Sequence, residues 1–358
     1  MLPDLKEICL NKIKESYSEF TGEYTERLDF ELNQIAGLEM ENTFLLCYEI
    51  AGLINHNKGL IGPSAGLSSG SLVLYLLGVT KVNPMEYDLL FEHFFPIDRI
   101  GTVAIGIEVD QDNLSIIRNK LEGNGFQVKN YLIIESRYCK TLEIIVDDNS
   151  ISIYESAALT EIAKRKPDDF ANIPLDDDRV FRRLSDSGKN LDFTELKSGL
   201  LAGFDAEQQD FLKQYAPGNI TELAQVFAYL EPWCNYDLNS ILMRRNGIRD
   251  LTRFQSVYFE ETNGIYTFPE QVSIMLQGYL GFSKQETQFY QRAMRKKINK
   301  LYVISEELFF RRGKEYKYDL IDLEQLWRNM MHYNSSMTDK TRETGKALLV
   351  YWWGYANS

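Results

Sequence analysis

A segment rich in glycine and serine, GPSAGLSSGS at residues 62–71, precedes an apolar stretch that continues through Leu77. This order predicts a loop that leads into a helix. The first N–H groups of a helix have no partner inside it, so such a junction can hold phosphate oxygens. The pattern is not specific by itself, because the Gly-Lys-Ser/Thr of a Walker-type loop is absent. Ser71 is interpreted as a helix N-cap or a packing serine rather than a nucleophile. The residues that would form the phosphate cradle are Gly62, Gly66, Ser69, Gly70 and Ser71.

Two segments in which apolar and polar residues alternate, as in strands, end in acidic side chains. These side chains could bind a metal ion. Glu108 and Asp110 end TVAIGIEVD, and Asp147 and Asp148 end TLEIIVDD. Glu108 and Asp110 are two residues apart, which places both on one face of a strand. Together these acids could form a rearranged Mg²⁺ site for nucleotidyl transfer. The alternative is that they are solvated acids on a half-exposed edge, and then no cofactor is expected.

Lysines and arginines gather in the C-terminal third of the chain. The formal net charge of −13 argues against a protein whose whole surface binds nucleic acid. Residues 241–358, however, hold more Lys and Arg than Asp and Glu. Arg292, Lys296 and Lys300 have the spacing of one helix face. This predicts either a weak, non-specific nucleic-acid site or an ordinary solvated helix face. Neighbouring aromatics that could stack on bases or lie in the core are Tyr290, Phe309 and Phe310. The candidate contacts are Arg292, Arg295, Lys296, Lys297, Lys300, Arg311 and Arg312.

The cysteines and histidines do not form a recognisable metal site. The cysteines contain no CxxC pair, and the histidines do not cluster with them. We therefore expect no metal bound by these residues, and we interpret the thiols as reduced core residues and His93 as a surface residue. A membrane span needs about 18–20 apolar residues in a run, and no such run or signal peptide is found, so a cytoplasmic protein without a membrane partner is expected. The residues concerned are Cys9, Cys47, Cys139, Cys234, His56, His93 and His332.

The elements that must position these residues follow from hydrophobic periodicity. We expect helices at 3–20, 24–58, 112–123, 204–230, 269–277, 283–300 and 321–333. We expect strands at 102–109, 127–134 and 141–147. From residue 152 the chain is expected to be mostly helical. The fold class is therefore α/β (α+β). We expect one domain at 1–150, which contains the N-terminal helices and a mixed sheet, and a helical domain at 151–358.

The order of these motifs resembles the palm and fingers of the C-family bacterial DNA polymerases, the family of the polymerase III alpha subunit. Residues 62–100, GPSAGLSSGSLVLYLLGVTKVNPMEYDLLFEHFFPIDRI, are similar to the palm signature of this family. RLDFEL is similar to R-L-x-x-E-L at the palm start, and IPLDDD to the segment that enters the fingers. Residues 215–232 and 264–297 resemble finger motifs, so the resemblance spans about residues 25–300. It implies a nucleotidyltransferase-like palm followed by a fingers-like helical domain.

The family's three catalytic aspartate positions carry other residues here. Counted without a gap from Arg99, the two aspartates of P-D-x-D-x-D correspond to Ala104 and Gly106, with Glu108 in the third place. The aspartate of the later strand corresponds to Ile145. In the family these carboxylates hold two metal ions that neutralise the attacking and leaving oxygens. A shift of two residues moves a group about 7 Å along a strand, so Glu108 alone does not rebuild the site.

Groups that would contact the substrate differ as well. The loop arginine of the family corresponds to Ala65 and its serine neighbour to Leu67. The arginine of the fingers R-P-G-P corresponds to Glu231, which reverses the charge where phosphate is expected. The thumb insertion is reduced to a few residues around 137–140. The phosphoesterase-like, clamp-binding and OB-type domains have no counterpart in this sequence.

We therefore hypothesise a catalytically inactive DNA polymerase III alpha-like protein with a binding or regulatory role linked to DNA replication or repair. Two alternatives stay open. One is an active metal-dependent nucleotidyltransferase with a rearranged site at Glu108, Asp110 and Asp147. The other is a non-specific nucleic-acid-binding module. The expected partners are a protein or weakly bound, non-specific DNA.

Overall fold

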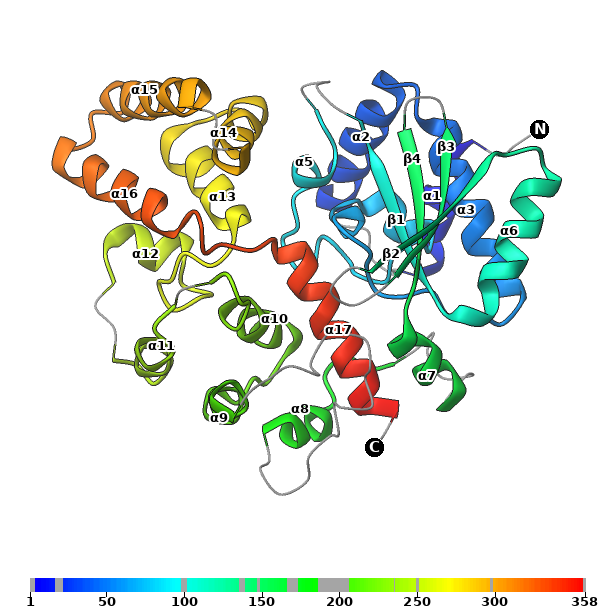
Figure 1. Cartoon of the computed structure of the whole chain (residues 1–358). Helices are drawn as coiled ribbons and strands as arrows, with labels where there is room; N and C mark the ends of the chain where they lie inside the picture. Colours follow the sequence, from blue (N-terminus) through cyan, green and yellow to red (C-terminus); the bar gives the residue numbers. More distant parts are fainter. Residues whose placement is uncertain are drawn as a thin grey trace.

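A mixed sheet with its helices forms one side of the molecule, and a group of helices forms the other (Figure 1). The last helix, α17 (Lys340–Ala356), lies between the two. This computed structural model confirms the predicted class, a mixed α/β region followed by a mostly helical one. It describes residues 4–16, 22–97, 102–134, 139–146, 149–165, 173–185, 206–234, 236–248, 251–296 and 299–356.

The sheet has four strands in the order β1-β4-β3-β2. Its strands are β1 (Ala104–Val109), β2 (Val128–Ile134), β3 (Cys139–Val146) and β4 (Asn149–Glu155). β1 and β4 pair in parallel, whereas β4 with β3 and β3 with β2 pair antiparallel. The expected strands at 102–109, 127–134 and 141–147 are thus confirmed within two residues at each end.

Strand β4 corrects the expectation that the chain is mostly helical from residue 152. Its sequence, NSISIYE, alternates between polar and apolar residues, and Ile151 and Ile153 are fully buried. That alternation is the pattern of a strand with one buried face. Because β4 is an inner strand, the sheet continues beyond residue 150, where we divided the chain. The division into two domains stays a prediction.

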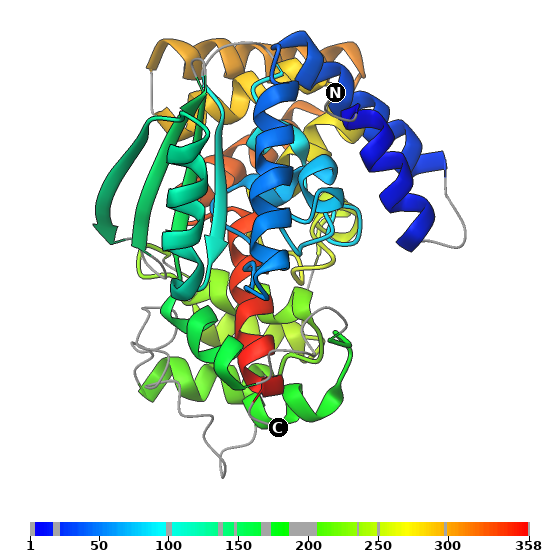
Figure 2. The same ribbon diagram turned by 90° about the vertical axis from the view of Figure 1, so that its right-hand side faces the viewer.

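The two faces of the sheet have different surroundings. Ile105, Ile107 and Val109 of β1 belong to the same core as Ile151 and Ile153 of β4. Helices α3 (Glu41–His56) and α6 (Leu114–Gly123) contribute to this core and cover that face (Figure 2). The opposite face of β1 begins with the exposed Ala104 and continues beneath the loop of residues 62–71.

The segment between α3 and β1 contains only short helical elements. Its Gly/Ser and Pro/Asn residues interrupt regular structure. The helix expected at 3–20 is confirmed in type as α1, whereas the one expected at 24–58 is two helices, α2 and α3, because the chain turns at Glu39, which has a φ of 56°. The elements not yet placed are α1 (Leu5–Ser16), α2 (Gly22–Gly37), η1 (Ser68–Gly70), α4 (Leu72–Leu76), α5 (Phe91–Phe94) and η2 (Gln111–Asn113).

The helical region follows the sheet. The predicted helix at 204–230 is in fact two helices, because the chain turns at Ala216, which has a φ of 49° and precedes a proline. The helices predicted at 269–277, 283–300 and 321–333 are confirmed in type. The elements are α7 (Ala157–Arg165), α8 (Asp178–Ser185), α9 (Ala206–Tyr215), α10 (Ile220–Tyr229), α11 (Leu238–Arg245), α12 (Arg253–Tyr258), α13 (Pro269–Leu280), α14 (Lys284–Lys296), α15 (Asn299–Glu315) and α16 (Leu320–Tyr333).

Helix α17 is buried along most of its length. It packs against α10, α7 and α8 and also contacts η1 of the Gly/Ser loop. Trp352 and Trp353 are 4% and 2% exposed, and the guanidinium of Arg165 lies 4.5 Å from the ring centre of Trp353. In the part of the chain that the structure describes, no helix is both long and apolar enough to cross a bilayer.

Candidate functional site

The Gly/Ser loop, residues 62–71, lies against β1. The N–H of Gly62 donates to the carbonyl of Glu108 at 2.8 Å. The N–H of Gly106 donates to the Ser68 hydroxyl, also at 2.8 Å. The loop therefore satisfies backbone groups at an edge of the sheet that no other strand covers.

Gly106 lies directly beneath this loop. A Cβ atom built on Gly106 would be 2.5 Å from the carbonyl oxygen of Ala65 and 2.9 Å from its Cβ. Contacts this short are not tolerated in a packed interior, so any side chain here would have to displace the loop backbone. The second family carboxylate position thus has no space for a carboxylate in this arrangement.

The three positions assigned to carboxylates by resemblance share one face of the sheet. Ala104 pairs with Ser150, and Ser150 pairs with Ile145, so these residues form one row across β1, β4 and β3. Gly106 is two residues further along β1, on the same face. Ile145 is 44% exposed on this face. The side chains at the three positions, the methyl of Ala104, the hydrogen of Gly106 and the alkyl group of Ile145, contain no metal ligand.

The start of α4 is capped by side chains of the chain itself. The Ser71 hydroxyl accepts the N–H of Leu74 at 3.2 Å, which confirms its interpretation as an N-cap. The carboxylate of Glu31 accepts the Ser71 hydroxyl at 2.8 Å. It also accepts the N–H groups of Leu72 and Val73 at 2.9 and 3.1 Å. The N–H groups of Leu72 and Val73, directly after the predicted phosphate cradle, therefore already have an anionic partner.

Arg27 holds Glu31 in this position. Its Nε donates to the Glu31 carboxylate at 2.6 Å, and its Nη2 donates to the carbonyls of Gly70 and Leu89 at 2.7 and 3.0 Å. The side chain of Glu31 is 0% exposed and that of Arg27 is 15% exposed, so the carboxylate is buried and the guanidinium is mostly covered. The RLDFEL motif thus fastens α2 to the loop. Sequence reasoning found the motif but missed this role, although an Arg and a Glu four residues apart indicate a pair on one helix face.

The predicted rearranged metal site contains two acids that the structure describes, Glu108 and Asp110, and both are buried. Glu108 is 1% exposed, and its carboxylate lies where a Cβ of Gly62 would point. Asp110 is 3% exposed and accepts the N–H of Leu60 at 2.6 Å and the Asn113 amide at 2.9 Å. Asp110 therefore stabilises the turn after β1. Asp147 and Asp148 lie outside the described residues, as do residues 137 and 138 of the reduced thumb segment.

The basic residues predicted to contact nucleic acid do not form one free surface. Arg295 pairs with Asp339, and Arg312 pairs with Glu286 at 2.9 Å. Lys300 and Arg311 are exposed on α15. The side chains of Lys296 and Lys297 lie outside the part of the chain that can be described. The aromatic residues predicted either to stack on bases or to lie in the core are core residues: Tyr290 and Phe309 are buried, and Phe310 packs against the same cluster.

Glu231, which the resemblance sets at the finger-arginine position, has a structural partner. Glu231 pairs with Lys346 of α17, and Lys346 also pairs with Glu343 at 3.0 Å. Glu231 and Lys346 are both only 9% exposed. The reversed charge at residue 231 therefore matches a buried lysine from the last helix.

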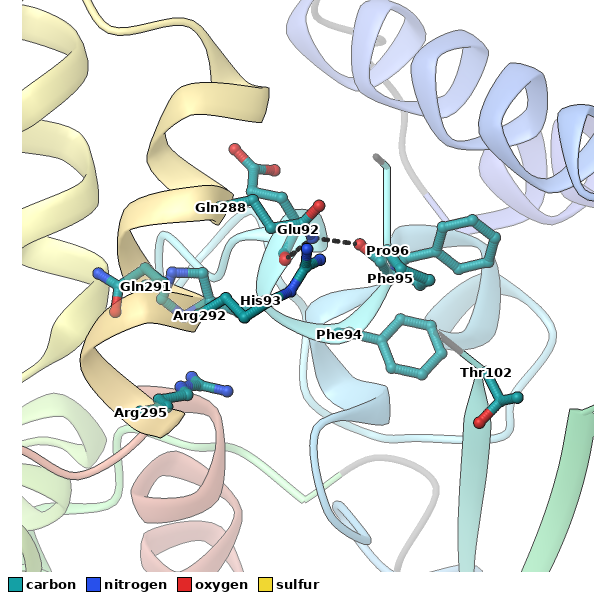
Figure 3. A pocket seen from close by; sticks show the side chains of 10 residues that line it. All are labelled: Glu92, His93, Phe94, Phe95, Pro96, Thr102, Gln288, Gln291, Arg292 and Arg295. Atoms are coloured by element: carbon teal, nitrogen blue, oxygen red, sulfur yellow. Dashed lines mark hydrogen bonds between the residues drawn. The ribbon is translucent and has the colours of Figure 1, made fainter. Parts of the chain in front are cut away.

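A cavity of about 220 Å³ lies between α5 and α14 (Figure 3). The Gln288 amide donates to the carbonyls of Glu92 and Phe95 at 2.7 and 2.9 Å, which ties α14 to the end of α5. Arg292 of α14 also lines this cavity. The side chain of His93 is only 3% exposed here. The interpretation of His93 as a surface residue is therefore wrong, because α5 packs against the helical region.

The cysteines that the structure describes agree with the expectation of reduced thiols. Cys9, Cys47 and Cys234 are free. Burial raises the pKa of Cys9 to about 12 and also raises the pKa of Cys47. Such thiols are protonated near neutral pH and are poor nucleophiles.

Comparison with known proteins points to one family along most of the chain. The model of the bacterial DNA polymerase III alpha NTPase domain matches residues 3–176. The model of the bacterial DNA polymerase III alpha subunit finger domain matches residues 151–317. DNA polymerase III subunit alpha of Aquifex aeolicus (strain VF5) is 30% identical over 131 residues, which is 35% of this chain and 11% of that protein. The proteins of the same name from Staphylococcus aureus strains Mu50 and N315 are 37% identical over 87 residues, 24% of this chain and 8% of theirs.

Proposed function

Because the chain belongs to the family of the bacterial DNA polymerase III alpha subunit, we propose that it is a catalytically inactive member whose scaffold serves binding or regulation in DNA replication or repair. The observation that carries this proposal is the packing at Gly106. The Ala65 carbonyl takes the space that a second catalytic carboxylate would need. The residues at the three family positions do not fit a pair of metal ions, since none of them has a ligand atom, and no metal-dependent step is derived for them.

The Glu31 cap at the start of α4 does not bear on activity, because Arg27 and Glu31 match the R-L-x-x-E-L of the family. A second observation does support the proposal. Glu231, at the finger-arginine position, is buried against Lys346 and cannot act as a phosphate ligand.

The second candidate is an active nucleotidyltransferase that uses Mg²⁺ at Glu108, Asp110 and Asp147. One observation favours it: the Glu108 side chain lies next to Gly62 of the loop, so one acid is close to the predicted nucleotide position. Asp110 is a poor second ligand, because the N–H of Leu60 and the Asn113 amide already bind its carboxylate. This candidate therefore has less support than the inactive one.

The proposal is tested at the binding step by titrating the purified chain with each deoxynucleoside triphosphate in the presence of Mn²⁺. We expect no saturable heat of binding up to millimolar nucleotide, whereas an active DNA polymerase III alpha subunit run in parallel gives a saturating isotherm. Saturable binding that Glu108→Ala abolishes would contradict the proposal and favour the rearranged site. The Ala104→Gly variant serves as the control, because it changes a neighbouring side chain without removing a carboxylate.

A further inference from the structure

Three potential metal ligands meet where α5, α13 and the start of α17 come together. They are His93 of α5, Glu270 in the first turn of α13, and Asp339, which directly precedes α17. One ligand atom of each lies within 4.8 Å of the others. This cluster lies on elements of the chain other than β1 and the Gly/Ser loop.

The two ring nitrogens of His93 have different surroundings. Its Nε2 is 3.0 Å from the hydroxyl of Ser273. If Nε2–H donates to this hydroxyl, the lone pair of the neutral ring lies on Nδ1. Nδ1 is buried without a hydrogen-bond partner and faces Oε1 of Glu270 at 3.5 Å. Two lone pairs that face each other in a buried site need a cation or a proton between them.

The separation of these atoms decides which of the two fits better. An N–H···O hydrogen bond is usually about 2.7–3.2 Å long, so 3.5 Å is long for a shared proton. Two ligands on a tetrahedral Zn²⁺, each at about 2.0–2.2 Å, are about 3.4 Å apart. The Nδ1–Oε1 distance therefore matches one edge of a tetrahedral site, and Asp339 would approach as the third ligand.

The groups around the cluster orient the ligands. Both carboxylate oxygens of Glu270 accept the N–H of Lys340, at 3.1 and 3.2 Å. Arg295 binds the carboxylate of Asp339. Hydrogen bonds of this kind commonly hold the ligands of protein metal sites, and Ser273 does the same for His93. The ammonium of Lys340 is bound to Glu261 and is therefore not directed at the cluster.

The cluster can be reached from solvent on two sides. His93 lines the cavity of about 220 Å³, and Asp339 lines a second cavity of about 320 Å³. Arg295 lines both cavities. A metal ion could enter by either route, and a water molecule could complete its coordination.

We propose that His93, Glu270 and Asp339 form a site for a divalent transition-metal ion of the Zn²⁺ class, which joins the sheet region to α13 and to the start of α17. One imidazole and two carboxylates are nitrogen and oxygen donors, which suit Zn²⁺ better than Mg²⁺. The site is structural, because it holds three separate parts of the chain together. It goes beyond the proposed function and does not depend on whether the chain has polymerase activity.

The test is a calorimetric titration of the chelator-treated full chain with ZnCl₂, with MgCl₂ as a second titrant. We expect one Zn²⁺ per chain and no comparable binding of Mg²⁺. His93→Gln and Asp339→Asn should each weaken Zn²⁺ binding at least about tenfold, and Ser273→Ala should weaken it about 10–100-fold through its effect on His93. His332→Gln, which changes an exposed histidine of α16, should leave the affinity unchanged.

A second readout covers the case in which a variant folds poorly. Co²⁺ added to the metal-free wild-type chain should give the intense visible absorption of a tetrahedral site, and Zn²⁺ should displace it. Wild-type protein that binds no Zn²⁺, or that binds it equally well after His93→Gln and after Asp339→Asn, would overturn the proposal. His93 and Glu270 would then face each other with no metal ion between them.

Discussion

Gly106 and Ala104 are two residues apart on β1, yet they tolerate side chains very differently. Ala104 is exposed at the start of the strand, whereas Gly106 has the backbone of Ala65 against it. The sequence register places both residues correctly on one face of a strand. It does not predict that the loop covers only the second, because that contact joins residues some forty positions apart.

Restoring an aspartate at these positions should therefore have unequal effects. We expect Gly106→Asp to lower the free energy of unfolding by roughly 3–5 kcal/mol, through overpacking and burial of an unpaired charge. Ala104→Asp should change it by less than about 0.5 kcal/mol, because its side chain reaches solvent. Urea unfolding of both variants measures the difference. Equal stability of the two would show that the loop moves away from Gly106 without cost.

Glu31 provides the second test at the residue scale. Glu31→Ala leaves Arg27 without its buried partner and removes the acceptor for the start of α4. We expect a loss of about 3–5 kcal/mol of stability. Asp29→Ala is the matched control on the same helix, because Asp29 is half exposed and pairs with Lys6 at the surface, and it should cost less than about 1 kcal/mol. Denaturant unfolding that shows similar losses for both would contradict the capping role.

Among the elements, periodicity predicted most of the helices and three of the four strands. It missed β4 because the strand lies directly between β3 and α7, so its alternation was read together with the helix that comes next. It also could not predict the position of α17. The polar residues of α17 indicate a solvated helix, yet Lys340 and Lys346 are buried, since acids from distant segments, Glu261 and Glu231, pair with them.

The pairing of α17 with residue 231 can be tested directly. Glu231→Arg introduces the residue type that the resemblance implies for this position, but the new cation would face the buried Lys346 with only Glu343 left to balance both. We expect a loss of roughly 3–5 kcal/mol in the free energy of unfolding, and adding Lys346→Met should recover at least half of it.

The control for this pair is Glu324→Arg. It makes the same change in an exposed pair with Arg328 on α16 and should cost less than about 1 kcal/mol. If Glu231→Arg is no more harmful than this control in thermal or urea unfolding, then α17 does not depend on the acid at residue 231.

For the molecule as a whole, charge argues against tight binding of nucleic acid. The net charge is −13, and two of the seven candidate contacts, Arg295 and Arg312, are paired with acids of the chain. Each phosphate contact contributes about −0.9 to the slope of log affinity against log salt on duplex DNA. We expect weak binding with a slope shallower than about −3.

Fluorescence anisotropy with labelled duplex and single-stranded DNA at several salt concentrations measures this slope. Lys300→Glu combined with Arg311→Glu should abolish the binding, because both side chains are exposed. Arg312→Glu should have a smaller effect on affinity, since Arg312 is already paired. Binding that persists at high salt, or that ignores the double change, would place the nucleic-acid surface elsewhere.

Primer extension shows whether this polymerase-family scaffold, proposed to be inactive, can synthesise DNA. A labelled primer–template is incubated with excess protein, all four deoxynucleoside triphosphates and either Mg²⁺ or Mn²⁺, beside an active DNA polymerase III alpha subunit. We predict that the primer is extended no further than in a blank without protein, because Ala104, Gly106 and Ile145 supply no metal ligand. Template-directed extension that is lost in the Glu108→Ala variant would contradict the account.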